Sequence, residues 1–313
     1  MEPRIQYAKT KDGVSIAFWT LGEGMPVVDM PMTVFSHVQL EWQVPEWRSY
    51  YERLAENRKV VRYDPRGAGL SERDVADFSL DAYLLDLEAV VDHLGLEGFV
   101  LYGSFALGPV AIAYAARHPE RVSRLLLWCS WARASDAYRS AQGQTLIALR
   151  ETDWEIYTET VAHLLMGWST GEPARRFAAL LRESGAQEAL RAGLRSVTEF
   201  DVTPLLPQVK VPTLVLHRRQ VPVPDLGVAR ALASGIPDAR LALLEGASLA
   251  PFLGDTEAVV TAIDEFLSEG EEAAPEAEPA EAGAFRTVLF TDVEGSTALT
   301  QRLGDAKARD LLR

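Results

Sequence analysis

The chain has 313 residues, 48% of them hydrophobic, which is enough for one large domain with a sizeable core and a further short piece. Its 45 acidic and 31 basic side chains leave a net charge of −14, which argues against binding to a nucleic-acid backbone, because phosphates would be repelled. The charged N-terminal stretch is unlike a secretory signal, and no run of about 18 apolar residues could span a membrane, so we expect a cytoplasmic protein that does not bind membranes.

The chain begins with a predicted β-hairpin. Residues 5–10 and 15–20 flank Asp12 and Gly13, a dipeptide suited to a tight turn. Residues 27–30 predict a short buried strand, and the segment MPMTVFSHVQLEW follows it. Within that segment we expect His37 to be a structural hydrogen-bonding group rather than a base.

The next strand is predicted at residues 59–63, and it leads into the turn YDPRGAGLSERD. Ser79 is suited to cap a helix, and apolar residues then recur at helical spacing until Gly95. This helix is expected to pack on the sheet.

Residues 99–119 predict a strand, a sharp turn and a helix, and we expect the functional site at this turn. The apolar run 99–102 meets a turn between Gly103 and Gly108, and Pro109 is suited to the first position of a helix. Another strand is expected at 122–128. Cys129, the single cysteine, comes directly after it and is therefore expected to be buried rather than reactive.

Residues 130–200 have a helical pattern, and strands are again expected at 213–217 and 240–244. Helices are predicted from Asp225 to residue 234 and over 256–267. The alternation of strands and helices predicts an α/β fold with a doubly wound, mostly parallel sheet. Residues 268–284 are acidic, contain two prolines and lack large apolar side chains, so we expect an extended, solvated linker and a domain boundary there.

The turn at 103–108 resembles the nucleophile elbow of α/β-hydrolases, which is written G-x-S-x-G. The segment beginning at Asp64 is similar to the D-x-R-G-x-G-x-S turn of the same superfamily, in which Asp64, Arg66 and Ser71 would brace a loop. The resemblance implies an α/β-hydrolase fold over residues 1–267, with a helical cap at about 130–200.

The positions of the catalytic triad are apolar or empty in this sequence. Aligned on Gly103, the nucleophile position holds Phe105, and the histidine position in EGASLAPF holds Leu249. The acid is missing near Gln220, and Asp225 is better suited to cap a helix. We therefore expect no catalytic residues in this domain, and we expect the elbow to have a relaxed backbone because it serves no reaction.

Replacement of the triad by apolar side chains predicts a dry pocket for a small apolar ligand. Its expected lining is Met32, Thr33, Ser104, Phe105, Ala106, Trp131 and Leu249. Two alternatives remain open: Phe105 and Leu249 simply fill the former cavity, or the domain is an active esterase-like hydrolase that uses a displaced nucleophile such as Ser104. We expect the aromatic side chains of the cap to serve mainly in packing, and the domain needs no cofactor.

The segment FTDVEGST, near residue 290, strongly resembles the opening of class III adenylate and guanylate cyclase domains. The resemblance implies that Asp292 and the backbone carbonyl of Val293 bind Mg²⁺ or Mn²⁺ in a complete cyclase. Residues 285–313 are too short to make a cyclic nucleotide from ATP or GTP, so we expect a piece of a longer, homodimeric signalling protein. In it, the first domain would be a pseudohydrolase that senses a ligand or arranges the cyclase dimer.

Overall fold

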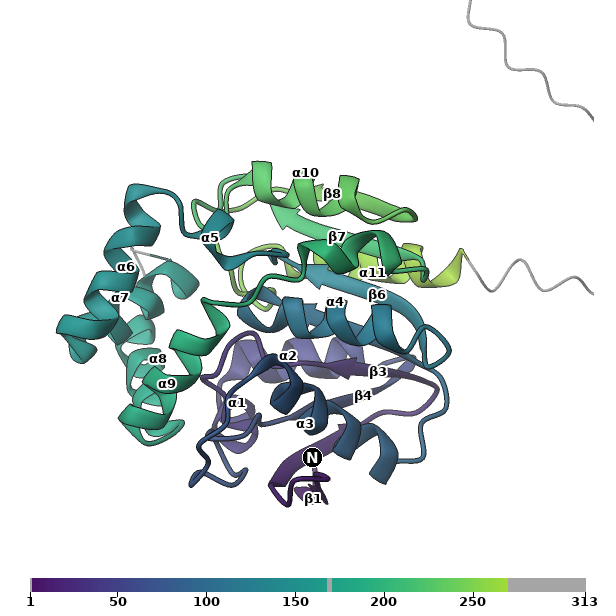
Figure 1. The fold of residues 1–313 in the computed structure, drawn as a ribbon, viewed down its shortest axis with the longest axis horizontal. Helices are drawn as coiled ribbons and strands as arrows, with labels where there is room; N and C mark the ends of the chain where they lie inside the picture. Colours follow the sequence, from purple (N-terminus) through teal and green to yellow (C-terminus); the bar gives the residue numbers. More distant parts are fainter. Residues whose placement is uncertain (1, 168–170, 270–313) are drawn as a thin grey trace, which may run out of the picture. The chain divides into compact units, whose positions relative to one another are not determined.

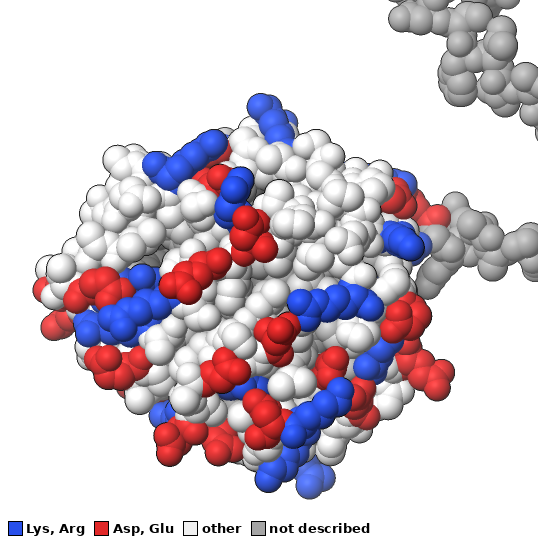
Figure 2. Space-filling model, in the orientation of Figure 1, with Lys and Arg blue, Asp and Glu red and all other residues white. Residues whose placement is uncertain are grey.

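The computed structural model describes residues 2–167 and 171–269 (Figure 1). The remainder of the predicted linker and the cyclase-like segment 285–313, with Asp292 and Val293, lie outside the described residues. Within the described ranges, no helix combines the length and apolar composition needed to cross a bilayer. Acidic and basic side chains are interspersed on the face drawn in Figure 2, without a continuous basic field.

The centre of the domain is an eight-stranded sheet in the order β1-β2-β4-β3-β5-β6-β7-β8. Only β2 runs antiparallel to its neighbours β1 and β4, and all other neighbouring pairs are parallel. The predicted α/β fold with a mostly parallel sheet is therefore confirmed. The strands are β1 (Gln6–Lys9), β2 (Ser15–Leu21), β3 (Met25–Asp29), β4 (Arg58–Tyr63), β5 (Phe99–Ser104), β6 (Val122–Trp128), β7 (Thr213–Arg218) and β8 (Ala239–Leu244).

Helices cover both faces of the sheet. One face packs against α3 (Leu80–His93), α4 (Gly108–Arg117) and α10 (Leu226–Gly235), and the other against α2 (Pro45–Leu54) and α11 (Thr256–Ser268). The predicted caps are confirmed, because the side chains of Ser79 and Asp225 accept hydrogen bonds from the first turns of α3 and α10. The short helix α1 (Val38–Gln43) and α2 are additions that the sequence analysis did not predict.

A group of helices forms a cap at one end of the sheet, on the left of Figure 1. These are α5 (Ala134–Ala137), α6 (Ala141–Thr152), α7 (Trp154–Met166), α8 (Glu172–Glu183) and α9 (Gln187–Val197), and the 3₁₀ segment η2 (Thr203–Gln208) leads back to the sheet. The cap packs on the core through aromatic pairs, of which Trp47 with Phe177 is one (5.6 Å between ring centroids). Phe177 therefore serves in packing, whereas Tyr157 also lines a cavity, and Trp168 lies outside the described residues.

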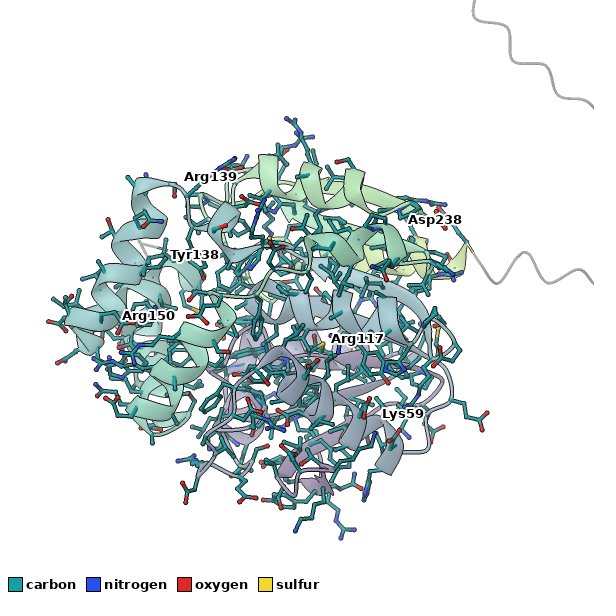
Figure 3. The ribbon with its side chains drawn as sticks, viewed as in Figure 1. Lys59, Arg117, Tyr138, Arg139, Arg150 and Asp238 are labelled. Carbon is teal, nitrogen blue, oxygen red and sulfur yellow. The ribbon has the colours of Figure 1, made fainter. Side chains whose placement is uncertain are left out.

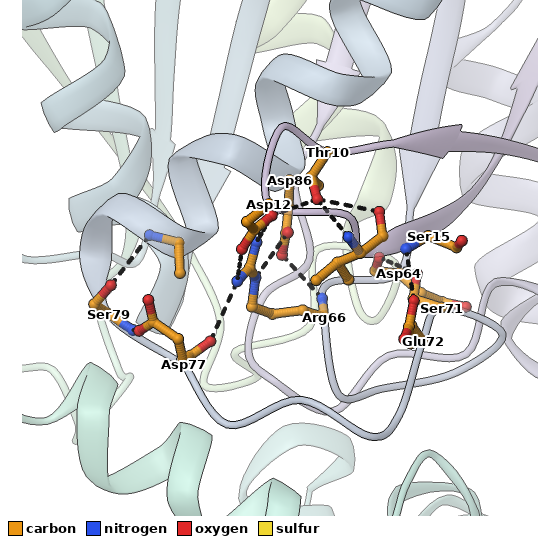
Figure 4. A network of polar contacts seen from close by, with 12 residues as sticks. Thr10, Asp12, Ser15, Asp64, Arg66, Ser71, Glu72, Asp77, Ser79 and Asp86 are labelled. Atoms are coloured by element: carbon orange, nitrogen blue, oxygen red, sulfur yellow. Dashed lines mark hydrogen bonds and ion pairs between the residues drawn. The ribbon is translucent and has the colours of Figure 1, made fainter.

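The turn after β4 is a buried polar brace, as predicted (Figure 4). The carboxylate of Asp64 accepts hydrogen bonds from the hydroxyl of Ser36 (2.7 Å) and the amide of Leu70 (2.8 Å). Ser71 donates to the backbone carbonyl of Asp64, and Arg66 forms an ion pair with Asp86 (2.9 Å). These contacts fix the loop and occupy the side chains of Asp64, Arg66 and Ser71.

Candidate functional site

The turn between β5 and α4 has a left-handed residue at its apex. Phe105 begins the short 3₁₀ segment η1 (Phe105–Leu107) with φ of +44°, a region that costs a side-chain-bearing residue about 1–2 kcal/mol. The expectation of a relaxed elbow is therefore wrong. Tertiary contacts hold the conformation, because the carbonyl of Phe105 accepts a hydrogen bond from Ser130 Oγ (3.0 Å) and the Ala106 amide donates to the carbonyl of Met32 (2.8 Å).

Two glycines allow the strand and helix to meet this closely. A Cβ on Gly103 would lie 2.4 Å from Cβ of Ala111, and one on Gly108 would lie 1.8 Å from Ser130 Oγ. Neither distance is compatible with a side chain, so both positions require glycine. The glycine-rich pattern therefore produces the sharp turn, although the residue at its apex is aromatic.

A phenyl ring occupies the place that the resemblance assigns to a nucleophile. The Phe105 ring is partly buried and makes an edge-to-face contact with Trp131, with centroids 4.8 Å apart at 79°. Such a ring has no ionisable or nucleophilic atom. The apex of the turn therefore supplies apolar surface only.

The amide after the apex residue is not free. In α/β-hydrolases this N–H helps to hold the oxyanion of the reaction intermediate. Here it belongs to Ala106, and it is bonded to the carbonyl oxygen of Met32. A substrate oxygen would have to displace a backbone hydrogen bond to use it.

The histidine position holds Leu249, which is 4% exposed. The carbonyl of Leu249 accepts a hydrogen bond from the indole nitrogen of Trp128 (2.6 Å). Arg218 donates from Nη1 to the carbonyls on either side, those of Ser248 (3.0 Å) and Ala250 (2.9 Å). The loop that would carry the base is therefore fixed around an apolar side chain.

Arg218 itself lies at the end of β7, where the triad acid would follow. It is 1% exposed and its guanidinium stacks over Trp128 at 5.2 Å, and burial lowers its pKa. No carboxylate forms an ion pair with Arg218 among the residues that the structure describes. Gln220, at the expected acid position, is exposed and donates to Glu245 (2.7 Å), so this position carries an amide in place of a carboxylate.

Neither histidine near the sheet edge is placed to act as a base for Ser104. His37 accepts from the amide of Leu40 through Nδ1 (3.3 Å) and caps α1, in line with its predicted structural role. His217 is fully buried, both of its ring nitrogens lack hydrogen-bond partners, and burial lowers its pKa to about 4. Over the described ranges, no hydrogen bond joins either residue to Ser104.

Ser104 lies on the face of the sheet that α2 covers. Side chains alternate along a strand, and a side chain at Gly103 would face α4, whereas Tyr102 reaches Tyr50 of α2 through their hydroxyls (3.4 Å). Ser104 therefore shares the α2 face with Tyr102. Cys129, after β6, is buried as expected, and burial raises its pKa to about 12, so its thiol is unreactive.

A mainly apolar cavity of about 60 Å³ lies between the elbow and the cap. Of the seven residues predicted to line a pocket, Met32, Thr33, Phe105 and Leu249 line it. Ser104, Ala106 and Trp131 do not line it. All three are buried elsewhere in the core, and Trp131 packs against the Phe105 ring. Whether the cavity binds a ligand stays a prediction.

The cap contributes lining residues that the sequence analysis missed, among them Tyr138, Arg150 and Tyr157. Arg150 is only 6% exposed, and its Nη1 donates to the carbonyl of Leu194 in α9 (2.9 Å). The sequence around Arg150 resembles any charged helix surface, so no local signal distinguishes this arginine. No group of three or more His, Cys, Asp or Glu side chains that could hold a metal occurs in the described part of the chain.

Comparison with known proteins places these features in a family. Residues 44–253 match the α/β-hydrolase fold family. A pimeloyl-[acyl-carrier protein] methyl ester esterase of Nitrosomonas europaea is 32% identical, over 70% of this chain and 88% of that protein. The α/β-hydrolase superfamily protein YisY of Bacillus subtilis is 24% identical over 83% of this chain and 98% of its own. The crystal structure of a hydrolase from Pseudomonas aeruginosa has a TM-score of 0.71 and 22% identity, covering 84% of this chain and 98% of that one.

Proposed function

The chain belongs to the α/β-hydrolase fold family, and we propose that its domain binds a small apolar molecule without hydrolysing it. The observation that carries the proposal is the elbow, where the ring of Phe105 takes the nucleophile's place and the Ala106 amide is bonded to Met32. The apolar cavity beside that ring supports a binding role.

Acyl transfer on this fold requires a nucleophile, a base, an acid that orients the base, and free oxyanion donors. The corresponding positions carry Phe105, Leu249, the exposed amide side chain of Gln220 and an occupied backbone N–H. Each substitution alone would lower the rate by orders of magnitude. Together they favour a pseudohydrolase.

We also propose that this domain regulates a class III nucleotide cyclase in a longer homodimeric protein. The support is the motif FTDVEGST, in which Asp292 and the carbonyl of Val293 would bind Mg²⁺ or Mn²⁺. In this proposal the domain over residues 1–267 senses the ligand or arranges the cyclase dimer, and the acidic segment 268–284 links the two. Assay of the complete cyclase with and without candidate ligands tests the link.

An active hydrolase that uses Ser104 is the second candidate, and the names of the relatives as hydrolases and esterases favour it. Against it, Ser104 lies on the α2 face of the sheet and has no hydrogen bond to a histidine anywhere in the described ranges. We therefore rank it below the binding function.

Two measurements on the intact chain test the binding proposal. Turnover of p-nitrophenyl butanoate is expected to equal the rate in buffer. Binding of butanol is expected to raise the melting temperature, and Val161→Phe, which fills the cavity from α7, is expected to abolish that shift. The matched control Ile156→Phe changes an exposed position of the same helix and is expected to leave the shift intact.

The outcomes separate the alternatives. Ester turnover that Ser104→Ala abolishes would support the hydrolase. The absence of any stabilisation by apolar molecules would support the reading of Phe105 and Leu249 as mere filling of an old cavity.

A further inference from the structure

The cap side of the cavity is lined by side chains that carry hydrogen-bond donors. Tyr138 and Tyr157 are two of them, and neither hydroxyl has a hydrogen-bond partner within residues 2–167 and 171–269. Arg150 lines it as well, and Figure 3 labels Arg150 and Tyr138 in the cap. Burial raises the pKa of both tyrosine hydroxyls, and the charge of Arg150 partly opposes that rise at each.

Two of the three guanidinium nitrogens of Arg150, Nε and Nη1, have hydrogen-bond partners among the described residues. Nε donates to Glu151 (2.7 Å), and Nη1 donates to the carbonyl of Leu194 (2.9 Å) and to the hydroxyl of Thr198 (3.4 Å). Nη2 has no partner in the described part of the chain. Arg150 is 6% exposed and lines the cavity, so this unpaired donor is available to an acceptor that enters there.

Glu151 forms ion pairs with both Arg150 and Arg195, so its charge is divided between two guanidinium groups. Its carboxylate also accepts from Nε of Arg195 (3.1 Å), so two guanidinium groups face one carboxylate. The cavity lining itself contains no acidic side chain, and Arg150 is its single charged residue within the described ranges. The cavity therefore has one positive end and an otherwise mainly apolar wall.

We propose, as a refinement that rests on the binding function above, that the ligand is a monocarboxylate with a short apolar tail. Its carboxylate would accept hydrogen bonds from Arg150 Nη2 and from the hydroxyls of Tyr138 and Tyr157. The tail would lie against Phe105 and Leu249 at the elbow. A cavity of about 60 Å³ has room for about four to six water-sized groups, which favours tails of a few carbon atoms.

The test compares butanoate with butanol, which share a tail and differ in charge, by titration calorimetry on the full chain. Butanoate is expected to bind at least about tenfold more tightly, because charge-assisted hydrogen bonds are the stronger kind. Arg150→Met is expected to weaken butanoate far more than butanol, so that the preference for the carboxylate disappears.

The matched control is Arg139→Met, which removes an exposed guanidinium paired with Asp225 outside the cavity and is expected to change neither affinity. Because Arg150 also bonds the backbone of α9, Tyr138→Phe with Tyr157→Phe provides a second test that removes only two oxygen atoms. This double variant is expected to weaken butanoate about three- to tenfold more than butanol.

The results distinguish the two levels of the proposal. Equal binding of butanol and butanoate, with a ratio that neither Arg150→Met nor the tyrosine pair changes, would overturn the carboxylate inference and leave the binding function standing. Failure of both molecules to bind, across butanoate, hexanoate and their alcohols, would overturn both.

Discussion

The amide nitrogen of Ala106 lies 2.8 Å from the carbonyl oxygen of Met32, so the loop after β3 is bonded to the elbow after β5. In α/β-hydrolases these two loops supply the pair of amides that hold a substrate oxyanion. Here the carbonyl of Met32 in one loop accepts the hydrogen bond from the Ala106 amide in the other. The contact both holds Phe105 in its left-handed conformation and removes a donor from catalysis.

Restoring a nucleophile and a base is therefore expected to fail. The double variant Phe105→Ser with Leu249→His supplies a hydroxyl and an imidazole but neither an orienting acid nor a free oxyanion amide. Losing an oxyanion donor costs about 10²–10³ in rate, and losing the acid about 10⁴. We expect hydrolysis of p-nitrophenyl butanoate no more than about tenfold above buffer. Enzyme-like turnover in a folded double variant would contradict this.

The strained backbone at Phe105 predicts an unusual order of stability. Phe105→Ala and Phe105→Gly both remove the ring from Trp131, but only glycine adopts a positive φ without cost. We expect the glycine variant to be more stable than the alanine variant by about 1 kcal/mol in urea unfolding. At most positions in proteins an alanine variant is more stable than a glycine variant. That order at position 105 would mean that the turn is not strained.

Arg218 is expected to be a major stabilising residue of the loop that carries Leu249. Arg218→Met leaves the carbonyls of Ser248, Ala250 and Leu253 without their donor in a buried setting. We expect a loss of about 3 kcal/mol in unfolding free energy, and faster hydrogen exchange in this loop. The neighbouring Arg219→Met, which removes a half-exposed ion pair with Glu245, is expected to cost less than about 1 kcal/mol. Equal effects of the two changes would contradict the account.

The buried, neutral side chain of His217 is expected to make the unfolding free energy fall in acidic solution. Burial lowers its pKa from 6.5 to about 4, so below pH 6.5 the unfolded chain takes up a proton that the folded chain does not. The unfolding free energy should therefore fall as pH drops from about 6.5 to about 4, with a slope of up to about 1.4 kcal/mol per pH unit from this residue. His217→Leu should flatten that part of the curve, measured by urea unfolding across this range. Parallel curves for the two proteins would argue against the buried neutral imidazole.

The sequence allowed the sheet, the capped helices and the elbow to be predicted because each depends on local patterns. Ser79 and Asp225 are followed by periodic helices, and Gly103 and Gly108 mark the one place where strand and helix must meet closely. The buried brace at Asp64 also follows from its motif. These features are local enough that tertiary packing does not override them.

Other features depend on contacts between distant segments. The positive φ of Phe105 follows from Met32 and Ser130, and the role of Arg218 follows from a loop more than two dozen residues away. Arg150 becomes part of the cavity only when α6 packs against α9. For α2, by contrast, a signal was present: Pro45 at the first helical turn precedes Trp47, Tyr50, Tyr51 and Leu54 at helical spacing.

The central claim is that the elbow of this domain has no reactive hydroxyl. Intact-mass spectrometry after treatment with a fluorophosphonate, which labels activated serines, tests it most directly. We predict that the chain keeps its unmodified mass and that Ser104→Ala behaves identically. A single phosphonyl adduct on the parent chain that Ser104→Ala abolishes would contradict the account.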